Sequence, residues 1–307
     1  MRERTFKNQS VVCFGEVLWD IFPNAQKAGG APFNVTYNLK QQKVESYILS
    51  RVGKDELGDQ LLRQIESWGI PTSYCQVDSE HATGTVLATL DENKEAHYDI
   101  ISPVAWDFIE WTPEYESLVS NSGAFVYGSL SARNEVSRNT LYRLLEHASY
   151  KIFDINLRPP FFSLPILEHL LHSADLVKIN KAELRQILEM LNKPYVSEED
   201  SVHFLQEKFN IGEILLTKGS KGALYYGGSV QHSFPCVPVT INDTVGSGDS
   251  FLAGYLAQII KGSTIEKSML NATAMGAFIT SKVGACPAYD LSEFEKFKLE
   301  KGVFTAD

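Results

Sequence analysis

The segment "NDTVGSGDSFLAG" (residues 242–254) places a carboxylate, Asp249, at the predicted start of an apolar helix. Gly246 and Gly248 free the backbone to turn its N–H groups toward one point, and a helix N-terminus attracts anions. Asp249 could simply cap the helix. Alternatively, the N–H groups around Gly246, Ser247 and Gly248 hold a phosphoryl group while Asp249 takes a proton from an attacking hydroxyl. We favour this second interpretation, because two glycines exceed what a cap needs.

A second set of residues suits the hydroxyl groups of a sugar. Asp20 is a lone carboxylate in the apolar run "VLWDIF". A buried charge needs a cation, hydrogen-bond donors or a ligand, although Asp20 could instead occupy an exposed turn. In "GGAPFNV", Gly29 and Gly30 remove side chains where a ligand could approach the backbone, and Asn34 then offers both a donor and an acceptor. The two glycines could equally form an ordinary strand-to-helix turn.

Two loops at the predicted carboxyl ends of strands carry further candidates. Asn156 and Arg158 in "DINLRPP" lie at the edge where open α/β sheets bind ligands, with a surface arginine as the alternative. In "NKAE", Asn180 and Glu183 have the spacing of a helix capping box, which needs no ligand.

The motifs exclude two large classes of phosphotransferase. The stretch "TKGSKGA" (217–223) lacks the spacing of a Walker A loop, and GxxxxGK[ST] occurs nowhere in the chain. Neither HRD nor DFG is present. The chain is therefore predicted to be neither a P-loop NTPase nor a protein kinase.

Composition narrows the class of partner. The 307 residues include 38 acids and 28 bases, a formal charge of −10, which argues against nucleic acid or an anionic membrane as partner. No apolar stretch approaches the roughly 18 residues of a membrane span. The N-terminus is polar, and the four cysteines are scattered without a metal-binding pattern. We therefore expect a cytoplasmic protein without a membrane segment.

Short apolar strands alternate with helical patterns along most of the chain. The predicted strands cover residues 11–17, 123–129, 151–156, 175–180 and 213–219, and the clearest predicted helices cover 55–69, 248–261 and 265–283. This order predicts an α/β fold with a mostly parallel sheet covered on both faces. Residues 82–101 break the pattern and look like a hairpin around a polar turn at 91–93, which suggests a small β-sheet appendage.

The motifs together resemble the ribokinase-like (PfkB) family of carbohydrate kinases, in its fructokinase-like branch. "DTVGSGDSF" is similar to the second motif of that family and "GGAPFNV" to the first, with further matches in "GEVLWD", "SRVGKDELG", "GSLSARNEVSR", "DINLRPP", "KINKAEL" and "TKGSKGA". Their order and spacing over some 270 residues make the resemblance specific. It implies a three-layer fold over a single domain (1–307), with a small β-sheet lid from segments near 15–30 and 80–108. It also implies ATP-dependent phosphorylation of a primary hydroxyl.

The resemblance implies a role for each motif residue. Asp249 would be the base, the N–H groups of Val245 to Gly248 the anion hole, and Arg158 an aid at the phosphoryl group. The sugar would meet Asp20, Gly29, Gly30, Asn34 and Asn156. ATP would meet Asn180, Thr217, Gly219 and Gly222, with Asn271 and Ala274 near the adenine. Mg²⁺ would be held through water by Asn180 and Glu183, and a monovalent cation such as K⁺ by Asp243, Val245, Lys282 or Gly284.

The sugar itself is less well determined. The motifs favour fructose, giving fructose 6-phosphate, while ribose, 2-keto-3-deoxygluconate and nucleosides stay open. Fructokinase-like sequences often carry an arginine in the lid, where this chain has "DIISPVAWD". Trp106 could stack on a sugar or pack beneath the lid. We also weigh a non-catalytic sugar-binding regulator on the same fold, and a homodimer formed through the lid.

Overall fold

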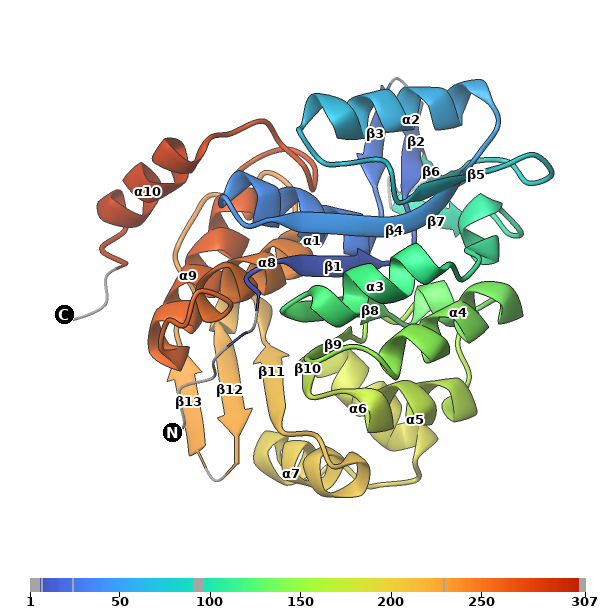
Figure 1. Cartoon of the computed structure of the whole chain (residues 1–307). Coiled ribbons are helices and arrows are strands. Elements are labelled where there is room, and N and C mark those ends of the chain that lie inside the picture. Colours follow the sequence, from blue (N-terminus) through green and yellow to red (C-terminus); the bar gives the residue numbers. More distant parts are fainter. Residues whose placement is uncertain (1–5, 7, 24, 91–95, 229, 304–307) are drawn as a thin grey trace.

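The computed structural model describes residues 6, 8–23, 25–90, 96–228 and 230–303, and its centre is a nine-stranded sheet (Figure 1). Neighbouring strands run parallel from β11 to β5, and β12 and β13 add an antiparallel edge. The predicted mostly parallel sheet is confirmed. The strand order is β13 (Val230–Phe234), β12 (Ala223–Gly227), β11 (Glu213–Thr217), β10 (Leu176–Asn180), β9 (Lys151–Asp154), β8 (Ala124–Gly128), β1 (Val11–Phe14), β4 (Ser46–Gly53) and β5 (Cys75–Asp78).

Helices cover both faces of this sheet, as the strand pattern predicts. Alternate residues of the central strand β1 belong to opposite cores: Val11 and Cys13 to one, Val12 and Phe14 to the other. One face packs on α1 (Ala31–Gln41), α2 (Glu56–Ser67), α8 (Ser247–Ile259), α9 (Ile265–Thr280) and α10 (Leu291–Glu300). The other packs on α3 (Pro113–Asn121), α4 (Glu135–Leu145), α5 (Leu164–Ser173), α6 (Lys181–Met190) and α7 (Glu198–Phe209).

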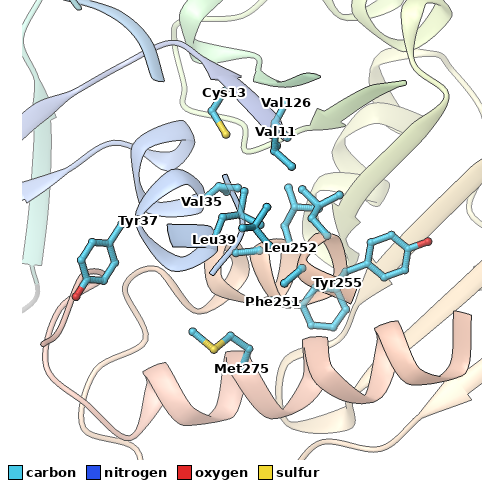
Figure 2. Close-up of a cluster of buried hydrophobic side chains, with 14 of the residues drawn as sticks. Val11, Cys13, Val35, Tyr37, Leu39, Val126, Phe251, Leu252, Tyr255 and Met275 are labelled. Carbon is cyan, nitrogen blue, oxygen red and sulfur yellow. The ribbon is translucent and has the colours of Figure 1, made fainter. Parts of the chain in front are cut away.

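The first core fixes α8, the helix that carries Asp249. Figure 2 shows side chains of α1 and α8 meeting beneath β1, with Met275 of α9 on the far side. Leu252 and Tyr255 of α8 are fully buried there. Burying such side chains contributes roughly 1.5–3 kcal/mol each, so the start of α8 is held firmly relative to α1.

A separate four-stranded sheet is built from two distant segments, in the order β3 (Ala25–Gly29), β2 (Leu18–Phe22), β6 (Gly84–Leu90) and β7 (Ala96–Ile100). The predicted 82–101 hairpin pairs β6 with β7, and its turn at 91–93 lies outside the described residues. Beyond Ile100 the chain returns to the main core, where Val104 and Trp106 are buried. The small sheet is therefore shorter than the 80–108 segment predicted for it. Its roles as a lid and as a dimer surface stay predictions.

The parallel strands end along one edge of the large sheet. Glu16, Asn156, Asn180 and Thr217 lie at or just after the carboxyl ends of β1, β9, β10 and β11. In open α/β sheets this edge is the usual ligand site.

No helix in the described part of the chain has both the length and the apolarity to cross a bilayer.

Candidate active site

Asp249 does not cap α8. The helix begins at Ser247, and its N-cap is Gly246, in the left-handed region at φ 75° without a side-chain cap bond. A Cβ at Gly246 would stand 2.4 Å from the Cβ of Ala285, so the turn requires glycine. Asp249 lies in the first helical turn, where its Oδ2 accepts a hydrogen bond of 2.8 Å from the Asn34 amide. The two predicted site residues, 215 positions apart, are thus in direct contact.

Some of the backbone N–H groups from Val245 to Asp249 donate hydrogen bonds within the loop, and the others are free to bind a ligand. The Val245 N–H donates to Asp243 Oδ1 (3.0 Å) and the Ser247 N–H to the Thr244 carbonyl (3.2 Å). Within the described residues, those of Gly246, Gly248 and Asp249 have no hydrogen-bond partner. The predicted anion hole of Val245 to Gly248 therefore needs correction, because the available donors are those of the two glycines and Asp249 itself.

A buried ion pair that sequence reasoning missed lies beneath this loop. The Lys178 ammonium is 2.7 and 2.9 Å from the two carboxylate oxygens of Asp154, at facing positions of β10 and β9. A Cβ at Gly248 would lie 3.0 Å from that ammonium. The one signal in the sequence is a lysine inside the apolar strand "DLVKIN".

These charges set the proton affinity of Asp249. Burial raises the pKa of Asp249 above its usual range, and the Asp154 carboxylate raises it further. The Lys178 ammonium, the Asn34 amide and Arg158 oppose that shift. Burial alone would lower the pKa of Lys178, but Asp154 and Asp249 raise it, so the lysine stays charged. A carboxylate with a raised pKa is a better proton acceptor, as a base requires.

The small sheet presents Asp20 beside Gly29, just before the start of α1. A Cβ at Gly29 would lie 2.5 Å from Asp20 Oδ2, so glycine leaves room for this carboxylate. Gly30, with φ 114°, begins α1 and passes against the Glu16 carbonyl, where a Cβ would be 2.2 Å away. Burial raises the pKa of Asp20 to about 6, against the attraction of Lys27 and Arg158.

Glu16 is a second residue that sequence reasoning missed. Its side chain is buried, its Oε1 accepts the Ala31 N–H (3.2 Å), and its Oε2 has no partner among the described atoms. Burial raises the pKa of Glu16 to about 7, with Arg158 lowering it and Asp249 raising it. The residue sits in "GEVLWD", but nothing in that stretch distinguishes a buried glutamate from an exposed one.

The Glu16→Gln variant should lose part of the pH dependence of stability. Because the folded-state pKa is raised from 4.5 to about 7, the native state binds the extra proton. Parent stability therefore falls as pH rises through this window, by about 3 kcal/mol at most. Glutamine keeps the acceptor for Ala31 but does not ionise. The Tm of the variant should separate from that of the parent between about pH 4.5 and 7, and should stay higher than the parent's above pH 7. The exposed Glu189→Gln is the control, and parallel profiles for E16Q would contradict the assignment.

The loop after β9 is tied to the start of α6 by Glu183. This carboxylate accepts the Asn180 N–H (2.8 Å) and the Leu157 N–H (3.3 Å). Asn156 has a φ of 39°, and Arg158 is exposed, with its guanidinium donating to the Leu157 carbonyl (3.1 Å). The positive charge of Arg158 lowers the pKa of each of Glu16, Asp20 and Asp249, against the effect of burial.

Asn180 and Glu183 form the capping box that their spacing predicts. Asn180 Oδ1 accepts the Ala182 and Glu183 N–H groups at 2.8 and 2.9 Å, and Glu183 is buried. Within the described chain, no cluster of three or more His, Cys, Asp or Glu side chains could hold a metal. Asn180 Oδ1 and both Glu183 carboxylate oxygens already accept backbone N–H groups, so a metal ion would have to meet these side chains through its water ligands.

A pocket of about 440 Å³ adjoins the start of α8, a volume typical of small-molecule sites. Of the predicted residues, Thr217, Gly219, Gly222, Ser247 and Gly248 line it. Ser220 and, from α8, Phe251 also line it. The remaining walls come from the segment after β13 and from α9: Cys236, Val237, Pro238, Val239, Ile241, Thr244, Thr273, Gly276, Ala277 and Thr280.

Asn271 and Ala274 are not in this lining, which corrects their predicted place near the adenine. The Asn271 amide donates to Gln42 Oε1 and the Gly254 carbonyl, both at 2.8 Å, and Ala274 is fully buried. From Ser268 to Ile279 helix α9 consists of small or apolar residues that are nearly all buried, so its sequence does not reveal which face meets the pocket. The pocket face carries Thr273, Gly276, Ala277 and Thr280 instead.

Trp106 is also corrected, from sugar stacking to packing. It is 1% exposed, and the Arg133 guanidinium lies 3.9 Å from its ring centre. Arg133 in turn pairs with Asp107 at 2.6 Å. A Cβ at Gly84 would stand 2.5 Å from the indole nitrogen. The ring is enclosed on both sides, which leaves no face for a ligand.

Comparison with known proteins agrees with this geometry. The family model described as "pfkB family carbohydrate kinase" matches residues 8–290. A fructokinase of Salmonella typhimurium is 26% identical over 301 residues, covering 92% of this chain and 96% of the relative.

Two solved structures have the same fold. A fructokinase from Xylella fastidiosa with bound ATP superimposes with a TM-score of 0.85 at 23% identity, covering 96% and 99% of the two chains. A Vibrio cholerae O395 fructokinase variant with fructose, ADP and potassium bound gives 0.82 at 24% identity, again covering 96% and 99%. With the family model spanning most of its length, this chain belongs to the pfkB family of carbohydrate kinases.

Proposed function

We propose that this chain transfers the γ-phosphoryl group of ATP to a primary hydroxyl of fructose, forming fructose 6-phosphate. The observation that carries the proposal is the position of Asp249. Its carboxylate touches Asn34 on one side, while Ser247 and Gly248 next to it line the pocket on the other. A base between an acceptor site and a phosphoryl site is what direct transfer needs.

Nucleotide binding is assigned to the pocket beside α8. The adenosine would lie among the apolar and small residues, with Thr217, Gly219 and Gly222 at its rim. The phosphates would meet the free N–H groups of Gly246, Gly248 and Asp249 at the start of α8, since a helix N-terminus attracts anions. When bound to the phosphates, Mg²⁺ supplies positive charge that stabilises the negative charge on the phosphoryl oxygens during transfer. Asn180 and Glu183 would contact this ion through water. Arg158 would approach the same phosphoryl oxygens.

Sugar binding is assigned to the space between the small sheet and α1. Asp20 offers an acceptor for two adjacent hydroxyls, and Asn34 holds the base. Gly29 and Gly30 keep that space open, and Asn156 borders it from the loop after β9. The relatives named as fructokinases favour fructose over ribose, 2-keto-3-deoxygluconate or a nucleoside. We further propose that the small sheet closes over the sugar and excludes water, which would otherwise accept the phosphoryl group.

A sugar panel tests the proposal. With ATP and Mg²⁺, we expect fructose to give the highest kcat/KM among fructose, ribose, 2-keto-3-deoxygluconate and adenosine, measured as ADP release. 6-Deoxyfructose is the matched control: it lacks the acceptor hydroxyl, so it should inhibit competitively without turnover. A higher kcat/KM for another member of the panel would overturn the fructose assignment while leaving the kinase intact.

A further inference from the structure

Lys27 extends from strand β3 of the small sheet toward the loop that precedes α8. Its ammonium lies 4.0 Å from Asp243 Oδ2. The side chain runs along Gly284, where a Cβ would stand 3.3 Å from Lys27 Cδ and 3.4 Å from the ammonium nitrogen. The ring of Phe22, on the same sheet, has its centre 5.4 Å from the ammonium. The positive charge is thus positioned by contacts from both the small sheet and the main body.

The surroundings of Asp243 do not fit a free monovalent cation well. Asp243 Oδ1 accepts the Val245 N–H at 3.0 Å, and Oδ2 accepts the Gly284 N–H at 2.9 Å. Both carboxylate oxygens therefore already face positive hydrogens, and the Lys27 ammonium faces Oδ2 as well. A potassium ion at this carboxylate would meet a like charge about 4.0 Å from the oxygen that it needs.

We propose that the Lys27 ammonium takes the place of a monovalent cation at Asp243, so that this kinase works without potassium. Asp243 is joined through Val245 to the loop whose N–H groups receive the phosphoryl group. Without a cation beside it, the Asp243 carboxylate would repel the incoming phosphoryl group. A positive charge at this point removes the repulsion. The inference rests on the proposed phosphoryl transfer and adds a residue that acts through Asp243.

The Lys27 ammonium also acts on a second carboxylate, that of Asp20. Lys27 and Asp20 occupy facing positions of β3 and β2, and the attraction of Lys27 opposes the rise that burial causes in the pKa of Asp20. One ammonium therefore acts on a carboxylate of the sugar site and on a carboxylate of the phosphoryl site. A free ion could not be tied to the small sheet in this way, because only a side chain moves with its strand.

The test compares potassium dependence in the parent and in Lys27→Met. At constant ionic strength, exchanging choline chloride for KCl should leave the parent kcat/KM and Tm unchanged, with any activity change below about twofold. Lys27→Met should lose activity about tenfold in choline chloride and regain most of it in KCl. Its Tm should also rise with KCl, since an ion that binds the native state stabilises it. Lys27→Arg, which keeps the charge, should behave like the parent.

Lys296→Met is the matched control. It removes the same charge from α10, where the lysine side chain is 76% exposed. Potassium activation of the parent by several-fold, or a Lys27→Met enzyme that does not respond to KCl in either activity or Tm, would overturn the inference. If the parent phosphorylated no sugar at all, the proposed function would fail, whereas the Tm comparison would still decide whether Lys27 occupies a cation site.

Discussion

Replacing Asp249 with Asn should lower kcat for fructose and ATP by roughly a hundredfold to ten-thousandfold. Asparagine keeps an oxygen that can accept the 2.8 Å bond from Asn34, so the start of α8 should retain its geometry. What is lost is the ability to take the proton from the attacking hydroxyl. Steady-state kcat, measured together with nucleotide affinity by calorimetry, separates the two effects, and affinity for ATP should change little.

The control for this variant is Asp59→Asn. Asp59 is also an acid in the first turn of a helix, α2, but it is exposed, whereas Asp249 lies among buried charges. It should leave kcat unchanged. A loss smaller than tenfold in Asp249→Asn would mean that another group is the base. A parent without activity on any sugar would instead favour the non-catalytic sugar-binding regulator.

The Lys178→Met variant should be the most destabilising of the substitutions considered for the site, by about 3–5 kcal/mol. Lys178 is 7% exposed and supplies the ammonium that pairs with Asp154. Without the ammonium, the repulsion between the carboxylates of Asp154 and Asp249 is offset less, so the pKa of Asp249, already raised, should rise further. Because the base must be ionised, the acid limb of kcat should move to higher pH. Urea denaturation and a pH–rate profile measure the two effects.

The double variant Lys178→Met with Asp154→Leu distinguishes lost charge from lost packing. Replacing both partners removes the unpaired carboxylate and leaves apolar side chains, which often restores stability. We expect the double variant to be more stable than Lys178→Met alone, with its acid limb back toward lower pH. A double variant as unstable as the single one would show that the lysine acts through packing, and an unchanged acid limb in the single variant would exclude electrostatic control of Asp249.

The short motifs were predictable because each depends on a local backbone requirement. Gly246 adopts a positive φ at the start of α8, and Gly30 does so at the start of α1. Both requirements leave a mark in the sequence that needs no knowledge of the rest of the chain. The capping box of Asn180 and Glu183 is equally local, since its two partners are three residues apart. The same reasoning missed α10, in which Phe294 alone is buried.

The errors concern residues whose role depends on what lies opposite them. Trp106 was compatible with a ligand or with packing until Arg133, 27 positions later in sequence, was placed against its ring. Asn271 and Ala274 were equally compatible with either face of α9. Lys178 and Glu16 are buried charges, and burial is a property of the assembled core, not of the strand that carries the residue.

The sequence by itself determined the strand–helix alternation, the family and the candidate for the base, because periodicity, glycine-rich turns and motif order are local properties of the chain. The tertiary structure alone decided that Asn34 holds Asp249, that Lys178 lies under Gly248, and that Lys27 faces Asp243. The physical reason is that hydrogen bonds and Coulomb interactions act over a few ångströms, and folding brings residues more than 200 positions apart within that range.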